Sequence, residues 1–224
     1  MEQIFIEVKI MKTFRAFTMI ELIFIIVVVG ILAAVAIPRI ERNGLIEAAD
    51  QLASHIRYTQ QLALSDNKFN ANARFWHRQL WQIQFNGTSY AIYSDRNVNN
   101  VSDAGEYAVD PMNPAKFLAS AGNGINATNQ NTKLNLANTY SIANITLGGA
   151  CQGRNNIGFD FKGRPMAVQA GNLYTGLYRA ACTITLTNEA GQTARIFVQP
   201  ETGYVGATAT DNPAGGDIAY TGLR

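Results

Sequence analysis

The strongest constraint on this chain is a long apolar run near its N-terminus. The 21 residues from Phe17 to Ile37 include one charged side chain, Glu21. As a helix the run would be about 31 Å long, close to the roughly 30 Å hydrocarbon thickness of a bilayer. Its apolar side chains outweigh the insertion cost of one carboxylate near the end of the run. The sequence therefore predicts a helix that crosses a membrane once.

The charges beside the run predict its orientation. Lys12 and Arg15 precede it, whereas Arg39 behind it is offset by Glu41. Basic residues favour the cytoplasmic side, so we expect the N-terminus in the cytoplasm and everything after Pro38 to be exported. The run is also longer than the apolar part of a cleaved signal peptide, about 7–15 residues. An uncleaved anchor is therefore expected.

Glu21 is the unusual residue of this run. An acid inside an apolar span can reach the lipid headgroups or be protonated, and then it has no further role. Alternatively it has a function and a cationic partner. The residues alone leave both interpretations open.

A short basic leader, the sequence "AFTMIEL", the apolar run and Pro38 at its end resemble the N-terminus of type IV pilins and type II secretion pseudopilins. The resemblance implies that a prepilin peptidase cuts between Ala16 and Phe17, removes residues 1–16 as a leader, and leaves Phe17 to be methylated. It also implies that Glu21 faces the N-terminal amine of a neighbouring subunit as helices stack into a filament. Ala16 stands where the family usually has glycine.

Helical spacing returns after Pro38. Five apolar residues fall near one face: Leu45, Ala49, Leu52, Ile56 and Ala63. Together with the apolar run they predict one long helix over residues 17–66, kinked at Pro38, with a transmembrane and assembly segment at 17–38. Residues 74–224 are expected to form a periplasmic β-rich domain.

Short alternating runs predict strands in this second part. "LWQIQF" and "SYAIYSD" flank Asn86-Gly87, a strong hairpin signal. "NIGFDFKGRPMAV" and "CTITLTNEAGQTARIFVQPETGYV" predict further hairpins. The predicted fold class is α+β: a long N-terminal, partly transmembrane helix packed on an antiparallel β-sandwich-like domain. Residues 113–156 are expected to be mostly exposed loop with one strand, "TYSIANITL".

The order of these runs, including "FDFKGRP" and "RIFVQPETGYV", resembles the GspH/FimT group of minor pseudopilins. This second resemblance extends over nearly all of the chain after the leader.

The stretch "DRNVNNVSDAGE" has the oxygen spacing of an EF-hand calcium loop. Counted from its first residue, ligands would come from positions 1, 3, 5, 7, 9 and 12: Asp95, Asn97, Asn99, the Val101 carbonyl, Asp103 and Glu106. Asn100 stands at the sixth position, where such loops have glycine, and no predicted helices flank the stretch. Calcium is one interpretation, and an Asn/Asp turn between strands is the other.

Cys151 and Cys182 are the two cysteines of the chain. Export would place both in an oxidising compartment, where a disulfide is expected. The bond would close a loop of 32 residues. On the chain-entropy model it would stabilise the fold by roughly 3–4 kcal/mol. Two buried free thiols are the alternative.

Signs of catalysis are weak in this sequence. It contains no G-x-S-x-G, H-E-x-x-H or Walker sequence. His55 is expected at a surface or interface, and Trp76, His77 and Trp81 are expected to pack in the core or against the helix. The net charge of +2 argues against a general nucleic-acid binder.

The expected function is that of a non-enzymatic minor pseudopilin in the pseudopilus of a type II secretion system. Its partners would be other pseudopilins or pilins in a hetero-oligomeric filament, the prepilin peptidase, an inner-membrane assembly platform and membrane lipid. Before assembly it would be single-pass in the inner membrane, and no cofactor other than calcium is expected. A minor pilin of a type IV pilus or DNA-uptake filament is the alternative within the family. A membrane-anchored periplasmic binding module or hydrolase is the alternative of another class.

Overall fold

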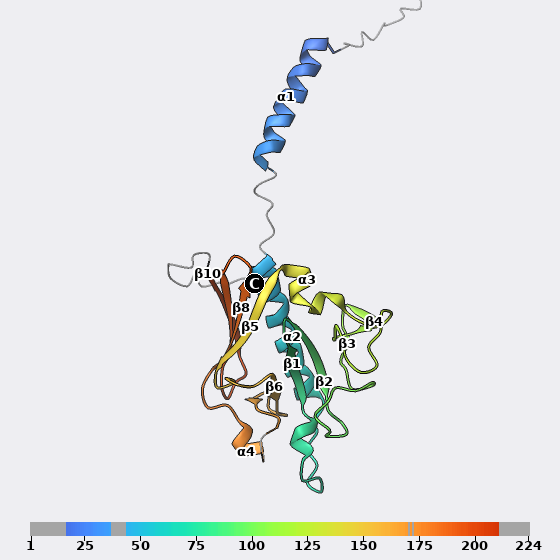
Figure 1. Ribbon diagram of the computed structural model, residues 1–224, viewed down its shortest axis with the longest axis vertical. Coiled ribbons are helices and arrows are strands. Elements are labelled where there is room, and N and C mark those ends of the chain that lie inside the picture. The colour runs from blue at the N-terminus through green and yellow to red at the C-terminus, as the bar shows by residue number, and fades with distance from the viewer. Residues whose placement is uncertain (1–16, 37–43, 170, 172, 211–224) are drawn as a thin grey trace, which may run out of the picture. The chain divides into compact units, whose positions relative to one another are not determined.

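The computed structural model describes residues 17–36, 44–169, 171 and 173–210 (Figure 1). The chain divides into two compact units, Met1–Arg42 and Asn43–Arg224. Helix α1 (Met19–Ala36) belongs to the first unit, and the remaining elements belong to the second. The predicted leader with Ala16, and the predicted kink at Pro38, lie outside the described residues.

Helix α1 is shorter than the apolar run. It has 18 residues, about 27 Å, whereas a membrane-spanning helix needs about 20. Phe17 and Thr18 precede it, and it ends at Ala36. In the part of the chain that the structure describes, no helix is both long enough and apolar enough to cross a membrane. The predictions of a transmembrane helix and of a single-pass inner-membrane location are therefore wrong.

The structure describes two parts of the predicted helix over 17–66. Helix α2 (Gly44–Ser65) begins as a separate element, and residues 37–43 between the two helices lie outside the description.

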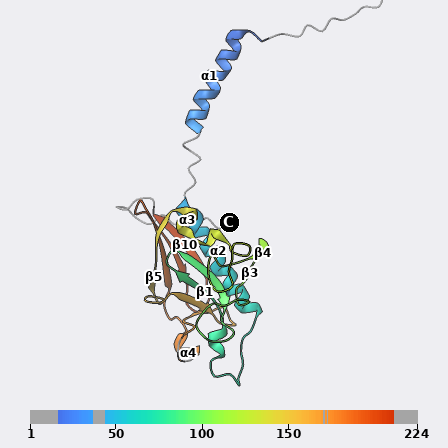
Figure 2. The same cartoon turned by 45° about the vertical axis from the view of Figure 1, so that its right-hand side comes forward.

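Helix α2 is amphipathic, unlike α1. The five apolar residues predicted on one face are all buried. Ala48, Ala53 and Thr59 are buried beside them, so the covered stripe repeats at three- and four-residue intervals. This stripe places α2 against strands of both large sheets (Figures 1 and 2).

The first large sheet has the strand order β2-β1-β6-β7. Its strands are β1 (Trp81–Asn86), β2 (Ser89–Ser94), β6 (Asn156–Phe159) and β7 (Pro165–Met166), and neighbours are antiparallel. The predicted hairpin at Asn86-Gly87 is confirmed, with Gly87 at a φ of 58°. Glycine adopts that angle without a Cβ clash.

The second large sheet has the order β10-β9-β8-β5 and is also antiparallel. Its strands are β5 (Ile142–Gly149), β8 (Cys182–Asn188), β9 (Thr193–Val198) and β10 (Val205–Thr210). The predicted strand "TYSIANITL" is confirmed from Ile142 onward as part of β5, whereas Thr139 and Tyr140 lie in a short helix. One apolar cluster contains side chains from α2 and from both large sheets, so the helix and sheets share a core.

Residues 113–156 are more structured than predicted. A small sheet pairs β3 (Val109–Asp110) with β4 (Asn113–Phe117). The 3-10 helix η3 (Thr132–Leu134) and α3 (Leu136–Tyr140) follow. Leu118, Leu134 and Leu136 are fully buried. These leucines bring the segment into the core, which its many asparagines did not indicate.

Two short helices complete the described fold. The 3-10 helix η2 (Trp76–Gln79) precedes β1, and α4 (Leu173–Gly176) follows β7. His77 and Trp81 are buried, as expected from packing. The fold class that the structure shows is α+β with antiparallel sheets.

Candidate functional site

The start of α1 contains two of the predicted site residues. Phe17 precedes the helix and is 73% exposed. Glu21 lies in the first turn, and its backbone N–H donates to Thr18 Oγ1 at 3.3 Å. Thr18 and Glu21 have the spacing of a capping box, in which a threonine accepts from the N–H three residues later. Glu21 therefore also stands at a helix-start position, a signal that the sequence analysis missed.

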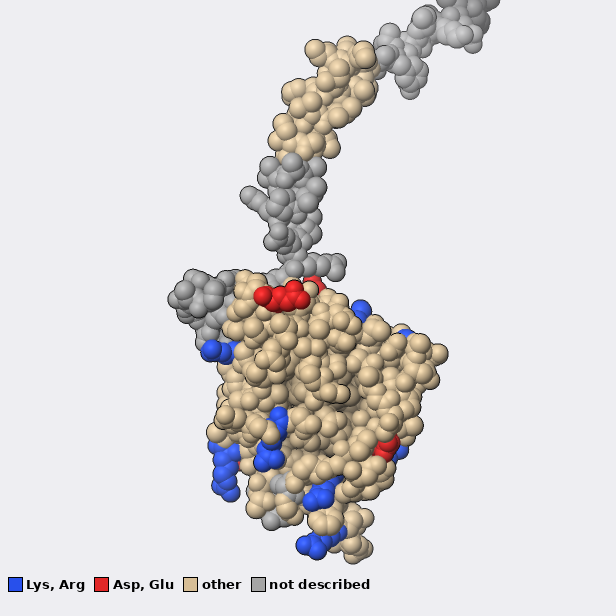
Figure 3. Space-filling view, viewed as in Figure 1, with Lys and Arg blue, Asp and Glu red and all other residues tan. Residues whose placement is uncertain are grey.

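The surface of α1 is apolar around its whole circumference. The consecutive residues Leu22, Ile23, Phe24, Ile25 and Ile26 are all exposed. Because successive residues are about 100° apart, five in a row point to every side of the helix. On the face drawn in Figure 3, the described part of α1 displays no charged side chain. A helix that is apolar all round is normally buried on every side, as in the core of a large protein or in a membrane.

The predicted calcium loop is closed by its own hydrogen bonds. Asp95 is fully buried, and its carboxylate accepts from the N–H groups of Asn99 and Asn100 at 3.1 and 2.9 Å. Glu106 is 5% exposed and accepts from the N–H groups of Arg96 and Asp103 at 2.8 and 3.0 Å. Both carboxylates are therefore hydrogen-bonded to the backbone of their own loop.

Asp103 differs from these two acids because it is held by side chains. The carboxamides of Asn123, Asn97 and Asn99 donate to it at 2.9, 3.1 and 2.7 Å. These donors lower the pKa of the Asp103 carboxyl below its usual range. Val101 is half-exposed and lies in the loop between β2 and β3. Across the described ranges, no group of three or more His, Cys, Asp or Glu side chains is placed to hold a metal. Calcium binding stays a prediction.

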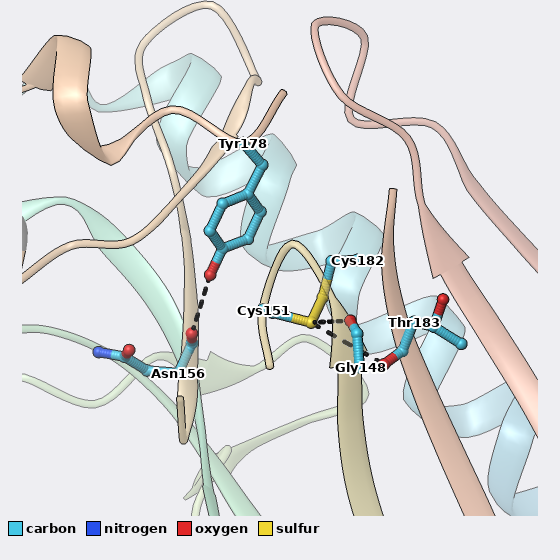
Figure 4. The surroundings of a disulfide bond; sticks show 6 residues. All are labelled: Gly148, Cys151, Asn156, Tyr178, Cys182 and Thr183. Carbon is cyan, nitrogen blue, oxygen red and sulfur yellow. Dashed lines mark hydrogen bonds between the residues drawn. A yellow bond between two sulfur atoms is a disulfide. The ribbon is translucent and has the colours of Figure 1, made fainter. Parts of the chain in front are cut away.

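The structure joins Cys151 to Cys182 in a disulfide (Figure 4). Cys151 follows β5 and Cys182 begins β8, and both side chains are fully buried. Cys182 is also the register partner of Gly149. The disulfide therefore closes the end of a strand pair that is already hydrogen-bonded.

The two sequence runs that resemble the GspH/FimT group meet at one side chain of α2. Gln60 Nε2 donates to the carbonyl oxygens of Gly163 and Thr202, at 2.8 and 3.0 Å. Gly163 and Gly203 have φ angles of 76° and 63°. A Cβ on Gly203 would lie 2.2 Å from Gly163 O, so the two turns can approach only with glycine there.

The turn that contains Gly163 is fixed by a buried acid. Asp160 is fully buried and accepts from the N–H groups of Lys162 and Arg164, both at 2.9 Å. The Arg164 guanidinium pairs with the same carboxylate at 2.7 Å. The sequence "FDFKGRP" is thus a turn whose acid binds its own backbone and its own arginine.

His55 lies in a polar network under α2. Its Nδ1 is 2.7 Å from Tyr90 Oη, which accepts from Gln51 Nε2 at 3.0 Å. Tyr140 Oη donates to Gln51 Oε1 at 2.8 Å. Burial lowers the pKa of His55 to about 4, although the Asp110 charge opposes that shift. His55 is therefore neutral near pH 7, as an interface residue between α2, β2 and α3.

Comparison with protein-family models, curated proteins and solved structures found no significant match to this chain.

Proposed function

We propose that this chain is a minor pseudopilin, a subunit that joins the pseudopilus of a type II secretion system through its N-terminal helix. The observation that carries the proposal is α1, an exposed helix that is apolar on every side and has one acid in its first turn. Packing among the same helices of other subunits would bury this surface. Burial contributes about 25 cal/mol per Å² of apolar area.

In this proposal Glu21 fixes the position of each subunit along the bundle of helices. Inside a bundle of apolar helices a carboxylate has little water, so an opposite charge attracts it strongly. The N-terminal amine of a neighbouring subunit would be that charge. A subunit displaced along the bundle would leave both charges unpaired, at a cost of several kcal/mol.

The β-rich unit supports the same assignment. The two runs that resemble the GspH/FimT group form turns that Gln60 holds together against α2. They are therefore neighbouring parts of one structural feature, although about 40 residues separate them.

The proposal is tested by the processed N-terminus. We expect intact-mass analysis and N-terminal sequencing of protein from sheared filaments to find a methylated Phe17 as the first residue. A chain that starts at Met1 or Met11, or one cut after Ala36, would contradict the assignment. Loss of protein export on gene deletion supports the secretion system, whereas loss of pili or of DNA uptake supports the alternative filament.

The charge of Glu21 is tested by substitution. We expect Glu21→Gln to reduce incorporation into filaments at least tenfold, because the amine loses its partner while the capping position keeps a suitable residue. Thr18→Ala is the matched control: it weakens the helix start by about 1 kcal/mol and leaves the charge in place. Co-purification with sheared filaments measures both. Equal incorporation of Glu21→Gln and wild type would show that the ion pair is not needed.

A further inference from the structure

A small polar cavity lies on the β2-β1-β6-β7 sheet and has no part in the proposed assembly. Its volume is about 130 Å³, more than one water molecule fills. Six residues line it: Gln84, Tyr93, Asn100, Asn155, Asn156 and Gln169. Five of the six carry a carboxamide.

The floor of this amide cavity comes from three neighbouring strands. Gln84 of β1 is the register partner of Asn156 on β6, and Gln82, two residues before Gln84, is the partner of Tyr93 on β2. Partners across an antiparallel pair point to the same face, as do residues two apart on one strand. Ile83 lies between Gln82 and Gln84 on β1, and its side chain packs in the apolar core with α2. The cavity therefore lies on the face of the sheet that points away from α2.

One buried polar group on this face of the sheet lacks a partner. Tyr93, which lines the cavity, is 1% exposed. Gln82 is fully buried behind Asn156, whose Nδ2 donates to Gln82 Oε1 at 2.7 Å, and Gln82 Nε2 has no partner among the described residues. Buried polar groups are nearly always hydrogen-bonded, so Gln82 Nε2 needs a bound molecule or water.

The lining also limits the charge of that molecule. Among the described residues, no Lys, Arg, His, Asp or Glu lines the cavity. Burial, with the nearby Asp95 and Glu106 charges, raises the pKa of Tyr93 far above its ordinary value, so its hydroxyl stays a neutral donor. A charged ligand would lose its hydration here and find no opposite charge.

We propose that the amide cavity binds one neutral sugar residue. A hydroxyl group both donates and accepts, and a carboxamide offers two donors and an acceptor. Adjacent hydroxyls on a sugar ring therefore match adjacent carboxamides of Gln84, Asn155 and Asn156. The Tyr93 hydroxyl adds one donor at the floor. Asn100 and Asn155 are exposed at the rim, which leaves the ring an entrance.

The test is saturation-transfer NMR on the full chain, kept in solution with a detergent that contains no sugar. The probes are glucose, galactose and mannose at millimolar concentration, with glucuronate and glucosamine as charged analogues and N-methylacetamide as a peptide-like amide. We expect at least one neutral hexose to bind and the charged analogues to bind more weakly. Binding by none of the three hexoses, stronger binding of a charged analogue, or binding of N-methylacetamide alone would overturn the proposal.

Variants locate the binding. Tyr93→Phe removes one oxygen and keeps the ring, so we expect it to weaken hexose binding about three- to tenfold. Gln84→Leu should weaken it at least as much, and Asn144→Ala on the exposed part of β5 should have no effect. If Gln84→Leu fails to fold, Tyr93→Phe alone decides. Unchanged hexose affinity in Tyr93→Phe would overturn the site.

Discussion

Single residues of α2 connect parts of the second unit that are distant in sequence. Gln60 is the clearest case, because its one amide nitrogen donates to carbonyls of two different turns. Among the described residues, these two carbonyl oxygens accept no other hydrogen bond. Both turns also contain a glycine at positive φ. The turns are therefore held by a side chain about 100 residues before the first of them.

We predict that Gln60→Leu lowers the free energy of unfolding by about 1–3 kcal/mol, because two carbonyl groups lose their donor. Urea denaturation monitored by circular dichroism measures the change. Gln61→Leu is the matched control, since Gln61 is the adjacent residue and is exposed. An equal effect of the two substitutions would show that the two hydrogen bonds contribute nothing specific.

At the scale of elements, the two helices differ in how much of their surface is apolar. Helix α1 is apolar on every side, whereas α2 buries one stripe and exposes residues such as Glu47 and Ser54. The apolar stripe of α2 is covered by the sheets of its own unit, whereas a helix that is apolar on every side is normally buried on every side. Strand pairing in the second sheet is reinforced at one end by the disulfide.

We predict that reduction of the disulfide lowers the free energy of unfolding by about 3–4 kcal/mol, since the unfolded chain regains the freedom of a closed loop. Urea midpoints with and without reductant measure this. A double variant, Cys151→Ala with Cys182→Ala, should be less stable than the oxidised protein and indifferent to reductant. A wild-type midpoint that does not move with reductant would contradict the prediction.

At the scale of the whole molecule, the second unit has one apolar core, to which α2 and both large sheets contribute side chains. Helix α2 contacts both large sheets and α3, and His55 lies in the network that joins α2 to β2. Its folded-state pKa of about 4 is below the ordinary 6.5. The unfolded chain therefore binds a proton between these values while the folded chain does not.

We predict that stability falls as pH decreases from about 6.5 to 4, by up to about 3 kcal/mol from His55 alone. In His55→Gln this part of the loss should disappear, because an amide accepts from Tyr90 without titrating. Melting temperatures of both proteins across this range measure the difference, and carboxylates that titrate in both cancel. Parallel curves for wild type and variant would show that His55 does not carry the effect.

The sequence by itself determined the features that depend on neighbouring residues. The Asn86-Gly87 hairpin, the apolar stripe of α2 and the hairpin within "NIGFDFKGRPMAV" each follow from local backbone geometry or a short repeat. Such signals need no knowledge of the rest of the chain. The resemblance of the N-terminus to pilins is local too, and its function stays a proposal.

Only the tertiary structure decided the features that combine distant residues. It brought residues 113–156 into the core through buried leucines and set Gln60 between two turns. It also satisfied the acids of the predicted calcium loop with N–H donors, and assembled the amide cavity from three strands and three loops. In each case the deciding quantity is a contact between residues far apart in sequence, and residue spacing carries no information about such contacts.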